Sequence, residues 1–274
     1  MTLKLYLASG ACSFVPHCLL ESAGADFEPV MIKLHRGEQY TDDYKALNPR
    51  SQVPVLVDDG AVITQIVAII CHLDARFPQA RILPPAGLAR TRALETLMWM
   101  NNTVHPTFTH IFMPQKFADN AAAQAEIKAF ALQSYRALLG ELQALVQKAA
   151  TAGQPFLAES GFGALDAYTL TLTRWGTLAG IDPAGYPDLW AFVERVAQVP
   201  AAQRAIEHFP NLGYSLRILQ QRGIIHFRQG DYAAARLDWE QAQIVKASEG
   251  HDDRLSEAAD AAAAASQVLQ DRDA

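Results

Sequence analysis

Residues 3–24 read LKLYLASGACSFVPHCLLESAG, and the order of elements in this stretch decides how the fold begins. The alternation over residues 3–8 predicts a β-strand. The next three residues predict a turn, and residues 14–23 predict a helix that ends at Gly24, because glycine readily adopts the left-handed conformation that stops a helix. Cys12 is therefore expected in the turn at the N-terminus of this helix.

The pattern continues up to about residue 82. We expect further strands at residues 27–34, 53–57 and 61–64, a short helix or turn at 40–47, and a helix at 66–77. Asp58-Asp59-Gly60 is a strong hairpin signal between the last two strands. This order predicts a small mixed sheet with helices on its faces.

Pro84-Pro85-Ala86-Gly87 predicts a linker, and residues 88–210 are helical in character. Further helices are expected at residues 165–178 and from Pro187 to Pro200. The longest run, residues 127–150, has apolar side chains at helical spacing: Ile127, Phe130, Leu138, Leu142, Leu145 and Val146. We therefore expect a second, all-α domain.

The composition changes again over residues 211–274. Small and aromatic residues at Ala235, Trp239 and Ala242 resemble one tetratricopeptide repeat of about 34 residues, and an alanine-rich stretch predicts a capping helix after it. A repeat of this kind normally needs at least about three stacked copies to be stable. A single copy is therefore expected to dock on the second domain or to pair with another chain.

The overall composition excludes several classes of protein. The apolar fraction of 50% is typical of a globular protein, and the net charge of −6 argues against nucleic-acid binding. The cysteines, Cys12, Cys18 and Cys71, are odd in number, and neither a CxxC pair nor a zinc spacing occurs, so we expect neither a disulfide framework nor a metal site. Without a signal peptide or a long apolar run, we expect a cytoplasmic protein that does not bind membranes.

Cys12 is the candidate catalytic residue that the sequence itself suggests. The first N–H groups of a helix are unpaired and its dipole favours a negative charge, which predicts a lowered thiol pKa. A thiolate there can exchange with a disulfide or attack an electrophile. Lone cysteines are more often buried and inert, and this is how we interpret Cys18 and Cys71.

Two further backbone features fit a peptide-like ligand. Pro54 opens a strand, and a cis bond before it would leave the N–H and C=O groups of Val53 unpaired at a sheet edge. The alternative is an ordinary edge-strand proline. Gln65 and Ile66 begin a second helix after a strand, where a carboxylate could bind.

Taken together, residues 1 to about 210 resemble a cytosolic glutathione transferase of the bacterial beta class. The resemblance rests on an ordered set of motifs: Ser9-Gly10-Ala11-Cys12-Ser13, Pro16-His17, Leu47-Asn48-Pro49, Gln52-Val53-Pro54, Leu83-Pro84, Trp99, Val104-His105-Pro106, Phe108 and Gly161-Phe162-Gly163-Ala164-Leu165-Asp166-Ala167-Tyr168.

The resemblance implies a glutathione transferase fold: an α/β thioredoxin-like N-terminal domain over residues 1–82 and an all-α domain over 88–210, followed by a short helical extension. It implies that Cys12 faces the sulfur of glutathione, that Ser13 donates a hydrogen bond to the thiolate, and that His105 reaches the same site. The backbone of Val53, before a cis Pro54, would pair with the cysteinyl amide of glutathione. A homodimer is also implied.

Some positions depart from the family pattern. Gln65 can still hold the γ-glutamyl carboxylate, but Ile66 offers only its backbone N–H, and Arg36 stands near the place of a lysine. Gly163 stands where the helix-capping box usually has Ser or Thr, while Asp166 supplies its acidic half.

Asn102 is a further candidate binding residue. It lies three residues before His105, so on an α-helix the two side chains would share a face. The alternative is a solvated polar residue.

Two functions remain open at this point. The first is an enzyme that conjugates glutathione to a small hydrophobic electrophile, or carries out glutathione-dependent thiol–disulfide exchange through Cys12. The second is a non-catalytic binding or regulatory protein that uses residues 211–274 to bind a protein partner. A purely structural extension is a third interpretation of those residues.

Overall fold

The computed structural model describes residues 2–207 of the chain. The chain divides into two units, residues 1–205 and 206–274. The predicted tetratricopeptide-like extension over residues 211–274 lies outside the described residues, so it stays a prediction.

Four strands form one sheet in the order β2-β1-β3-β4. They are β1 (Leu3–Leu7), β2 (Glu28–Met31), β3 (Val55–Asp58) and β4 (Ala61–Thr64). β2 runs parallel to β1, whereas β3 is antiparallel to both β1 and β4. The predicted mixed sheet and its hairpin are confirmed. β2 is shorter than predicted, because the chain enters 3₁₀ turns from Leu34 onward.

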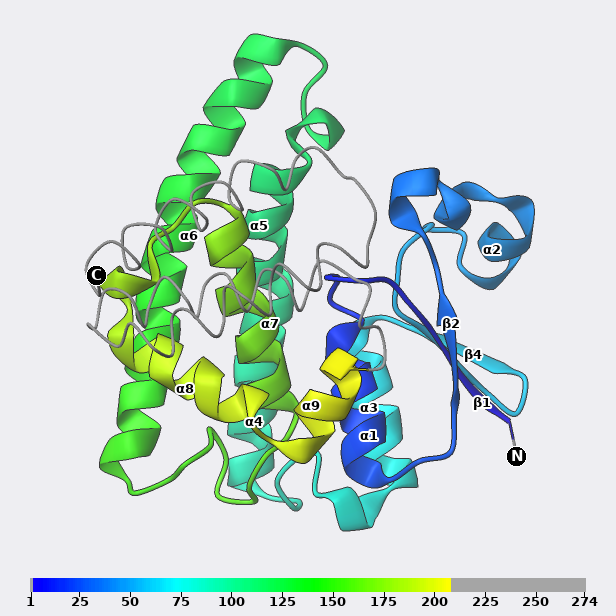
Figure 1. The fold of residues 1–274 in the computed structure, drawn as a ribbon, viewed down its shortest axis with the longest axis vertical. Coiled ribbons are helices and arrows are strands. Elements are labelled where there is room, and N and C mark those ends of the chain that lie inside the picture. Colours follow the sequence, from blue (N-terminus) through cyan, green and yellow to red (C-terminus); the bar gives the residue numbers. More distant parts are fainter. Residues whose placement is uncertain (1, 208–274) are drawn as a thin grey trace, which may run out of the picture. The chain divides into compact units, whose positions relative to one another are not determined.

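Helices cover both faces of this sheet. α1 (Phe14–Ala23) and α3 (Ile66–Arg76) lie between the sheet and the helical domain (Figure 1). α1 ends as predicted, at Gly24 in the left-handed conformation with φ 62°. The small cluster of Ile32, Tyr44 and Val55 lies beneath α2 (Asp42–Leu47), which supplies Tyr44.

The second part of the chain is all helical, as predicted. It contains α4 (Leu88–Trp99), a π-helical turn (Met100–Val104), α5 (His105–Phe112), α6 (Ala121–Thr151), α7 (Ala164–Leu178), α8 (Pro187–Ala197) and α9 (Pro200–Glu207). The helix that begins at Pro187 ends at Ala197, shortly before Pro200 as expected, and Pro200 is then the first residue of α9. Among the helices of the described residues, none is long and apolar enough to cross a membrane.

α7 is the central helix of this part, and every residue from Ala164 to Gly176 is buried. The hydroxyl of Tyr135 on α6 donates to the carbonyl of Leu172 at 2.7 Å. A Cβ added at Gly176 would lie 2.8 Å from Leu139 Cδ1, so glycine lets α6 approach closely. α7 therefore holds its side chains in fixed positions.

The predicted apolar face of α6 was wrong at Phe130, whose side chain is 74% exposed. The buried residues of this helix begin one position later and follow helical spacing: Ala131, Tyr135, Leu138, Leu139, Leu142, Val146 and Ala149. Phe130 is thus one residue away from the stripe that packs.

The N-terminus of α7 explains the glycine that replaces Ser or Thr. A Cβ at Gly163 would lie 2.6 Å from the carbonyl oxygen of Ile82, well inside van der Waals contact. The two oxygens of Asp166 accept hydrogen bonds of 2.8 Å from the N–H groups of Gly163 and Leu157. Only the acidic half of the capping box is therefore present, and close approach of the linker backbone excludes the other half.

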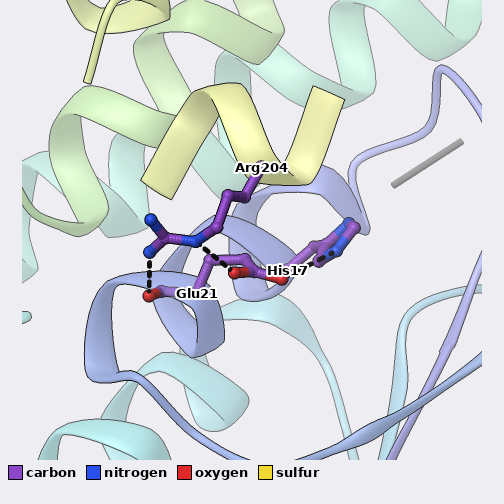
Figure 2. A network of polar contacts seen from close by, with 3 residues as sticks. All are labelled: His17, Glu21 and Arg204. Atoms are coloured by element: carbon purple, nitrogen blue, oxygen red, sulfur yellow. Dashed lines mark hydrogen bonds and ion pairs between the residues drawn. The ribbon is translucent and has the colours of Figure 1, made fainter. Parts of the chain in front are cut away.

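α9 is fastened to α1 by an ion pair. Arg204 Nε lies 2.7 Å from Glu21 Oε2, and its Nη2 donates to the Glu21 carbonyl at 2.7 Å. Figure 2 shows His17 on the other side of the same carboxylate, with Nε2 3.9 Å from Glu21 Oε1. The end of the helical domain thus contacts the first helix of the chain.

Candidate functional site

Cys12 lies in the turn between β1 and α1, as the sequence predicted. Its side chain is 8% exposed, and its Sγ donates to the carbonyl of Val53 over 3.5 Å. The turn therefore brings the cysteine to the loop that precedes β3, 41 residues away along the chain.

Burial raises the pKa of the Cys12 thiol to about 12, while the backbone N–H groups of Cys12 and Ser13 lower it by less. The predicted lowering of this pKa was wrong, because desolvation of the thiolate exceeds the effect of the helix N-terminus. At neutral pH Cys12 is a thiol that carries its proton.

Ser13 is completely buried, and its hydroxyl is used by the chain itself. The oxygen accepts a hydrogen bond of 3.0 Å from the N–H of Ala8 and donates one of 3.1 Å to the Ala8 carbonyl. These bonds fasten the cysteine turn to the end of β1. Donation from Ser13 to a thiolate stays a prediction, and it requires the hydroxyl proton to leave Ala8.

Two donors from α7 meet on one carbonyl of the cysteine turn. The carbonyl oxygen of Gly10 accepts 2.6 Å from Arg174 Nη2 and 2.9 Å from the indole nitrogen of Trp175. Gly10 itself has φ 69°, which favours glycine. Neither Arg174 nor Trp175 was singled out by the sequence analysis, because neither residue lies in a motif that signals this contact.

The Val53–Pro54 peptide bond is cis, as expected. The preceding carbonyl, that of Gln52, accepts hydrogen bonds of 2.8 Å from both Tyr44 Oη and Asn48 Nδ2. Asn48 and Tyr44 therefore fix the segment that carries Val53 next to Cys12.

His105 begins α5 and faces α7. Its Nδ1 lies 2.8 Å from the hydroxyl of Tyr168, and its ring packs on Trp175 with centroids 4.8 Å apart. Since Trp175 also binds Gly10, one side chain contacts both the predicted histidine and the cysteine turn. Burial lowers the pKa of His105 to about 4, so the ring is neutral at pH 7.

Because of the π-helical turn, Asn101 rather than Asn102 contacts Tyr168, the hydrogen-bond partner of His105. The His105 N–H bonds the carbonyl of Met100, five residues earlier, which defines a wider turn than an α-helix has. Asn101 reaches the Tyr168 hydroxyl at 3.3 Å, whereas Asn102 is exposed and accepts a hydrogen bond from Asn101. The α-helical spacing that led to Asn102 does not hold here, and the role of Asn102 in binding stays a prediction.

The remaining predicted binding residues lie at two other places. Gln65 is exposed, caps the N-terminus of α3 and has φ 74°, an unfavourable conformation for a residue with a side chain. The side chain of Ile66 is only 4% exposed, and Arg36 is exposed at the end of a 3₁₀ turn. The contacts that join Cys12, Val53 and His105 do not extend to these three residues.

Residues 1–75 match the family model described as "Glutathione S-transferase, N-terminal domain". The glutathione S-transferase GstA of Escherichia coli O157:H7 is 32% identical over 210 residues, which cover 74% of this chain and 97% of that protein. The chain belongs to the glutathione S-transferase family.

Solved structures of the family have the same fold. A sphingomonad glutathione S-transferase, whose structure is described as complexed with glutathione, is 32% identical with a TM-score of 0.64, and the match covers 75% of this chain and 98% of that one. A beta class glutathione S-transferase of Sphingomonas chungbukensis is 30% identical with a TM-score of 0.65 over 75% and 98% of the two chains. The predicted thioredoxin-like domain and helical domain are confirmed.

Proposed function

We propose that this glutathione S-transferase conjugates glutathione, its co-substrate, to small hydrophobic electrophiles. The observation that carries the proposal is the placement of Cys12 beside Val53, whose peptide bond to Pro54 is cis, with His105 connected to the same turn through Trp175. The glutathione-bound sphingomonad relative supports the choice of ligand.

Glutathione is a peptide with two carboxylates, and the site offers partners for each part of it. The N–H and C=O groups of Val53 can pair with its cysteinyl amide as a strand would. The γ-glutamyl carboxylate suits Gln65 and the backbone N–H of Ile66 at the N-terminus of α3, where unpaired N–H groups favour an anion. The exposed guanidinium of Arg36 is the proposed partner of the glycine end of glutathione, and the amide of Asn102 is a further proposed partner on the side of His105.

The protonated state of Cys12 favours conjugation over thiol–disulfide exchange. Exchange needs Cys12 as a thiolate, which its raised pKa disfavours. As a thiol, Cys12 can transfer its hydrogen bond from the Val53 carbonyl to the sulfur of glutathione when the ligand's own amide takes that carbonyl. The donated hydrogen bond then stabilises the glutathione thiolate.

In the conjugation step the glutathione sulfur gives up its proton and forms a bond to the electrophilic carbon. The leaving group departs with the electron pair of the bond that breaks. Thiol–disulfide exchange through Cys12 is the second candidate, favoured by the contact that places its sulfur at the Val53 carbonyl. In that reaction Cys12 would form a mixed disulfide with one half of oxidised glutathione and release the other half as a thiolate.

One set of measurements tests both reactions. Purified full-length protein is incubated with glutathione and chlorodinitrobenzene, and the conjugate is followed by its absorbance. We expect turnover that falls in Cys12→Ala and is retained in the control Cys71→Ala. A mass spectrum after incubation with oxidised glutathione reports a Cys12 adduct. Formation of the Cys12 adduct without turnover would contradict conjugation and support thiol–disulfide exchange. The absence of both would contradict both proposed activities.

Membership of the beta class and a cytoplasmic homodimer are parts of the same proposal. Apolar side chains remain exposed on β4 and α4, at Val62, Leu88 and Met98, and contact with a second copy would cover them. Light scattering measures the mass in solution, and a monomeric mass would contradict the dimer.

The role of residues 211–274 as a partner-binding module can be tested by truncation after Pro210. A partner that co-purifies with the full chain and not with the truncated one would support it. The match to named transferases over almost their whole length favours the enzyme over a non-catalytic binding protein.

A further inference from the structure

The ring of His105 is one end of a short chain of hydrogen bonds. Its Nδ1 lies 2.8 Å from the hydroxyl oxygen of Tyr168, and that hydroxyl donates to Oδ1 of Asn101 over 3.3 Å. The amide of Asn101 is oriented in turn, because its Nδ2 donates to Oδ1 of Asn102 at 2.9 Å. The chain thus leads from an exposed side chain to the histidine of the candidate site.

With the Asn101 amide oriented so that Nδ2 donates to Asn102 and Oδ1 faces Tyr168, the number of protons fixes the direction of these hydrogen bonds. A phenol has one proton, and a neutral imidazole carries one N–H. When Tyr168 donates to Asn101, the phenol oxygen can only accept from His105, so Nδ1 must carry the imidazole proton. In the reverse arrangement Tyr168 would donate to Nδ1, and Oδ1 of Asn101 would lose this donor. The first arrangement makes two hydrogen bonds and the second makes one.

We propose that Tyr168 and Asn101 are positioning residues that hold His105 in the neutral tautomer with its proton on Nδ1, so that Nε2 accepts the thiol proton of bound glutathione. The inference rests on the proposed function, in which His105 lies beside the glutathione sulfur. As the sulfur attacks, its S–H bond breaks, the proton passes to Nε2 and then to solvent, and the sulfur electron pair forms the bond to carbon.

The surroundings of both rings keep this arrangement in place. Burial lowers the pKa of His105 to about 4, so the imidazole stays neutral at pH 7 and readily returns a proton that it has accepted. Burial also raises the pKa of Tyr168 well above its ordinary value, so the phenol keeps its proton. Each group is thus in the protonation state that the hydrogen-bond chain requires.

The π-helical turn explains how Asn101 reaches Tyr168. A helix with i to i+5 hydrogen bonds has a wider turn, so the residue four positions before His105 comes closer to its face than the residue three positions before it. Asn101 is at the first of these positions, and Asn102 is at the second and points to solvent. Single π turns inside helices are frequent at functional sites.

The tautomer can be measured directly by NMR on the full chain labelled with ¹⁵N-histidine. Couplings between ring nitrogens and carbon-bound protons distinguish Nδ1–H from Nε2–H, and the signals of His105 are those missing from His105→Gln. We expect the Nδ1–H form at pH 7. The Nε2–H form in the unmodified chain would overturn the proposal.

Three variants test whether the hydrogen bonds from Asn101 through Tyr168 set the tautomer of His105. Tyr168→Phe removes the hydroxyl that accepts the hydrogen bond from His105, and Asn101→Leu removes the amide that accepts from Tyr168. Thr103→Val is the control, because it changes an exposed residue of the same π turn. We expect a mixture of tautomers in the first two and the Nδ1–H form in the third. Should Tyr168→Phe fold poorly, Asn101→Leu carries the test alone. An unchanged tautomer in Asn101→Leu would remove its positioning role.

Kinetics and binding separate this inference from the proposed function. Loss of one hydrogen bond in Asn101→Leu is expected to lower kcat about fivefold with little change in KM for glutathione. The tautomer is measured without glutathione, and glutathione binding is measured separately by calorimetry. A protein that shows the Nδ1–H form of His105 but does not bind glutathione would contradict the proposed function alone. A protein that binds glutathione but shows the Nε2–H form would contradict only the positioning role of Tyr168 and Asn101.

Discussion

Arg174 Nη2 donates a hydrogen bond of 2.6 Å to the carbonyl oxygen of Gly10, 164 residues earlier in the chain. The bond joins the central helix of the helical domain to the turn that carries Cys12. Trp175 binds the same oxygen and also packs on His105. The position of the cysteine turn therefore depends on α7, which belongs to the other half of the family fold.

Replacing Arg174 with Met should both destabilise the protein and loosen the cysteine turn. A hydrogen bond from a charged donor contributes about 1.5–3 kcal/mol, and Arg174 is buried, so we expect a loss of about 2 kcal/mol and a higher KM for glutathione. Arg195→Met is the matched control, because exposed Arg195 also donates to a carbonyl, that of Pro155 at 2.9 Å. Equal losses in denaturant titrations of the two variants would refute the special role of Arg174.

Gly163→Ala should destabilise the protein although alanine favours helices. The added Cβ would lie 2.6 Å from the carbonyl oxygen of Ile82, and overpacking of this kind costs about 1–3 kcal/mol. Gly140→Ala provides the comparison within α6, since its Cβ would meet nothing within 4 Å. There we expect a gain of about 0.5–1 kcal/mol. A stable Gly163→Ala protein in thermal unfolding would show that the linker can move away.

The thiol of Cys12 should react slowly in the free enzyme. Its pKa of about 12, against an ordinary value of 9.0, leaves a thiolate fraction about a thousandfold smaller at pH 7.5 than that of an unburied thiol. Alkylation by iodoacetamide, followed by peptide mass spectrometry, should therefore be much slower at Cys12 than in a free cysteine peptide and should rise with pH beyond pH 10. Rapid labelling at pH 7 would mean that the helix N-terminus outweighs burial after all.

Asp166 should make stability depend on pH. Burial raises its pKa from 3.8 to about 6, so between these values the folded state binds the proton more tightly than the unfolded state does. The contribution to the free energy of unfolding is therefore full below about pH 4 and falls by about 2–3 kcal/mol as the pH rises through 6. Asp166→Asn should lack this fall, which denaturant titrations from pH 4 to 7.5 would measure. Parallel pH profiles of the two proteins would contradict the assignment.

Local sequence signals predicted the N-terminal half closely. Gly24 ends α1 at the expected residue, and the Asp58-Asp59-Gly60 hairpin joins β3 to β4, because turn and cap residues act within a few positions of the chain. The motifs that carry the family resemblance implied that Cys12 and the Val53 backbone contact the same ligand, and in the structure Cys12 Sγ lies 3.5 Å from the Val53 carbonyl oxygen.

Long-range contacts and burial were not predictable in the same way. Neither Arg174 nor Asn101 has a local signal, because their partners are separated from them by 164 and 67 residues. The direction of the Cys12 pKa depends on how much water the folded chain removes from the thiol, and this outweighs the local effect of the helix dipole.

The π turn at Met100–Val104 makes the helix around it sensitive to the number of its residues. Deleting one residue there would permit an uninterrupted α-helix from α4 into α5, with regular backbone hydrogen bonds. If the chain kept all its residues but formed a regular α-helix here, every later side chain would instead be rotated by about 100° relative to α4, since a π turn holds one residue more than an α turn and each residue advances an α-helix by that angle. His105 would then leave the face that meets Tyr168 and Trp175. The π turn thus determines that the His105 side chain faces the site, and a regular α-helix over the same residues would turn His105 away from the site.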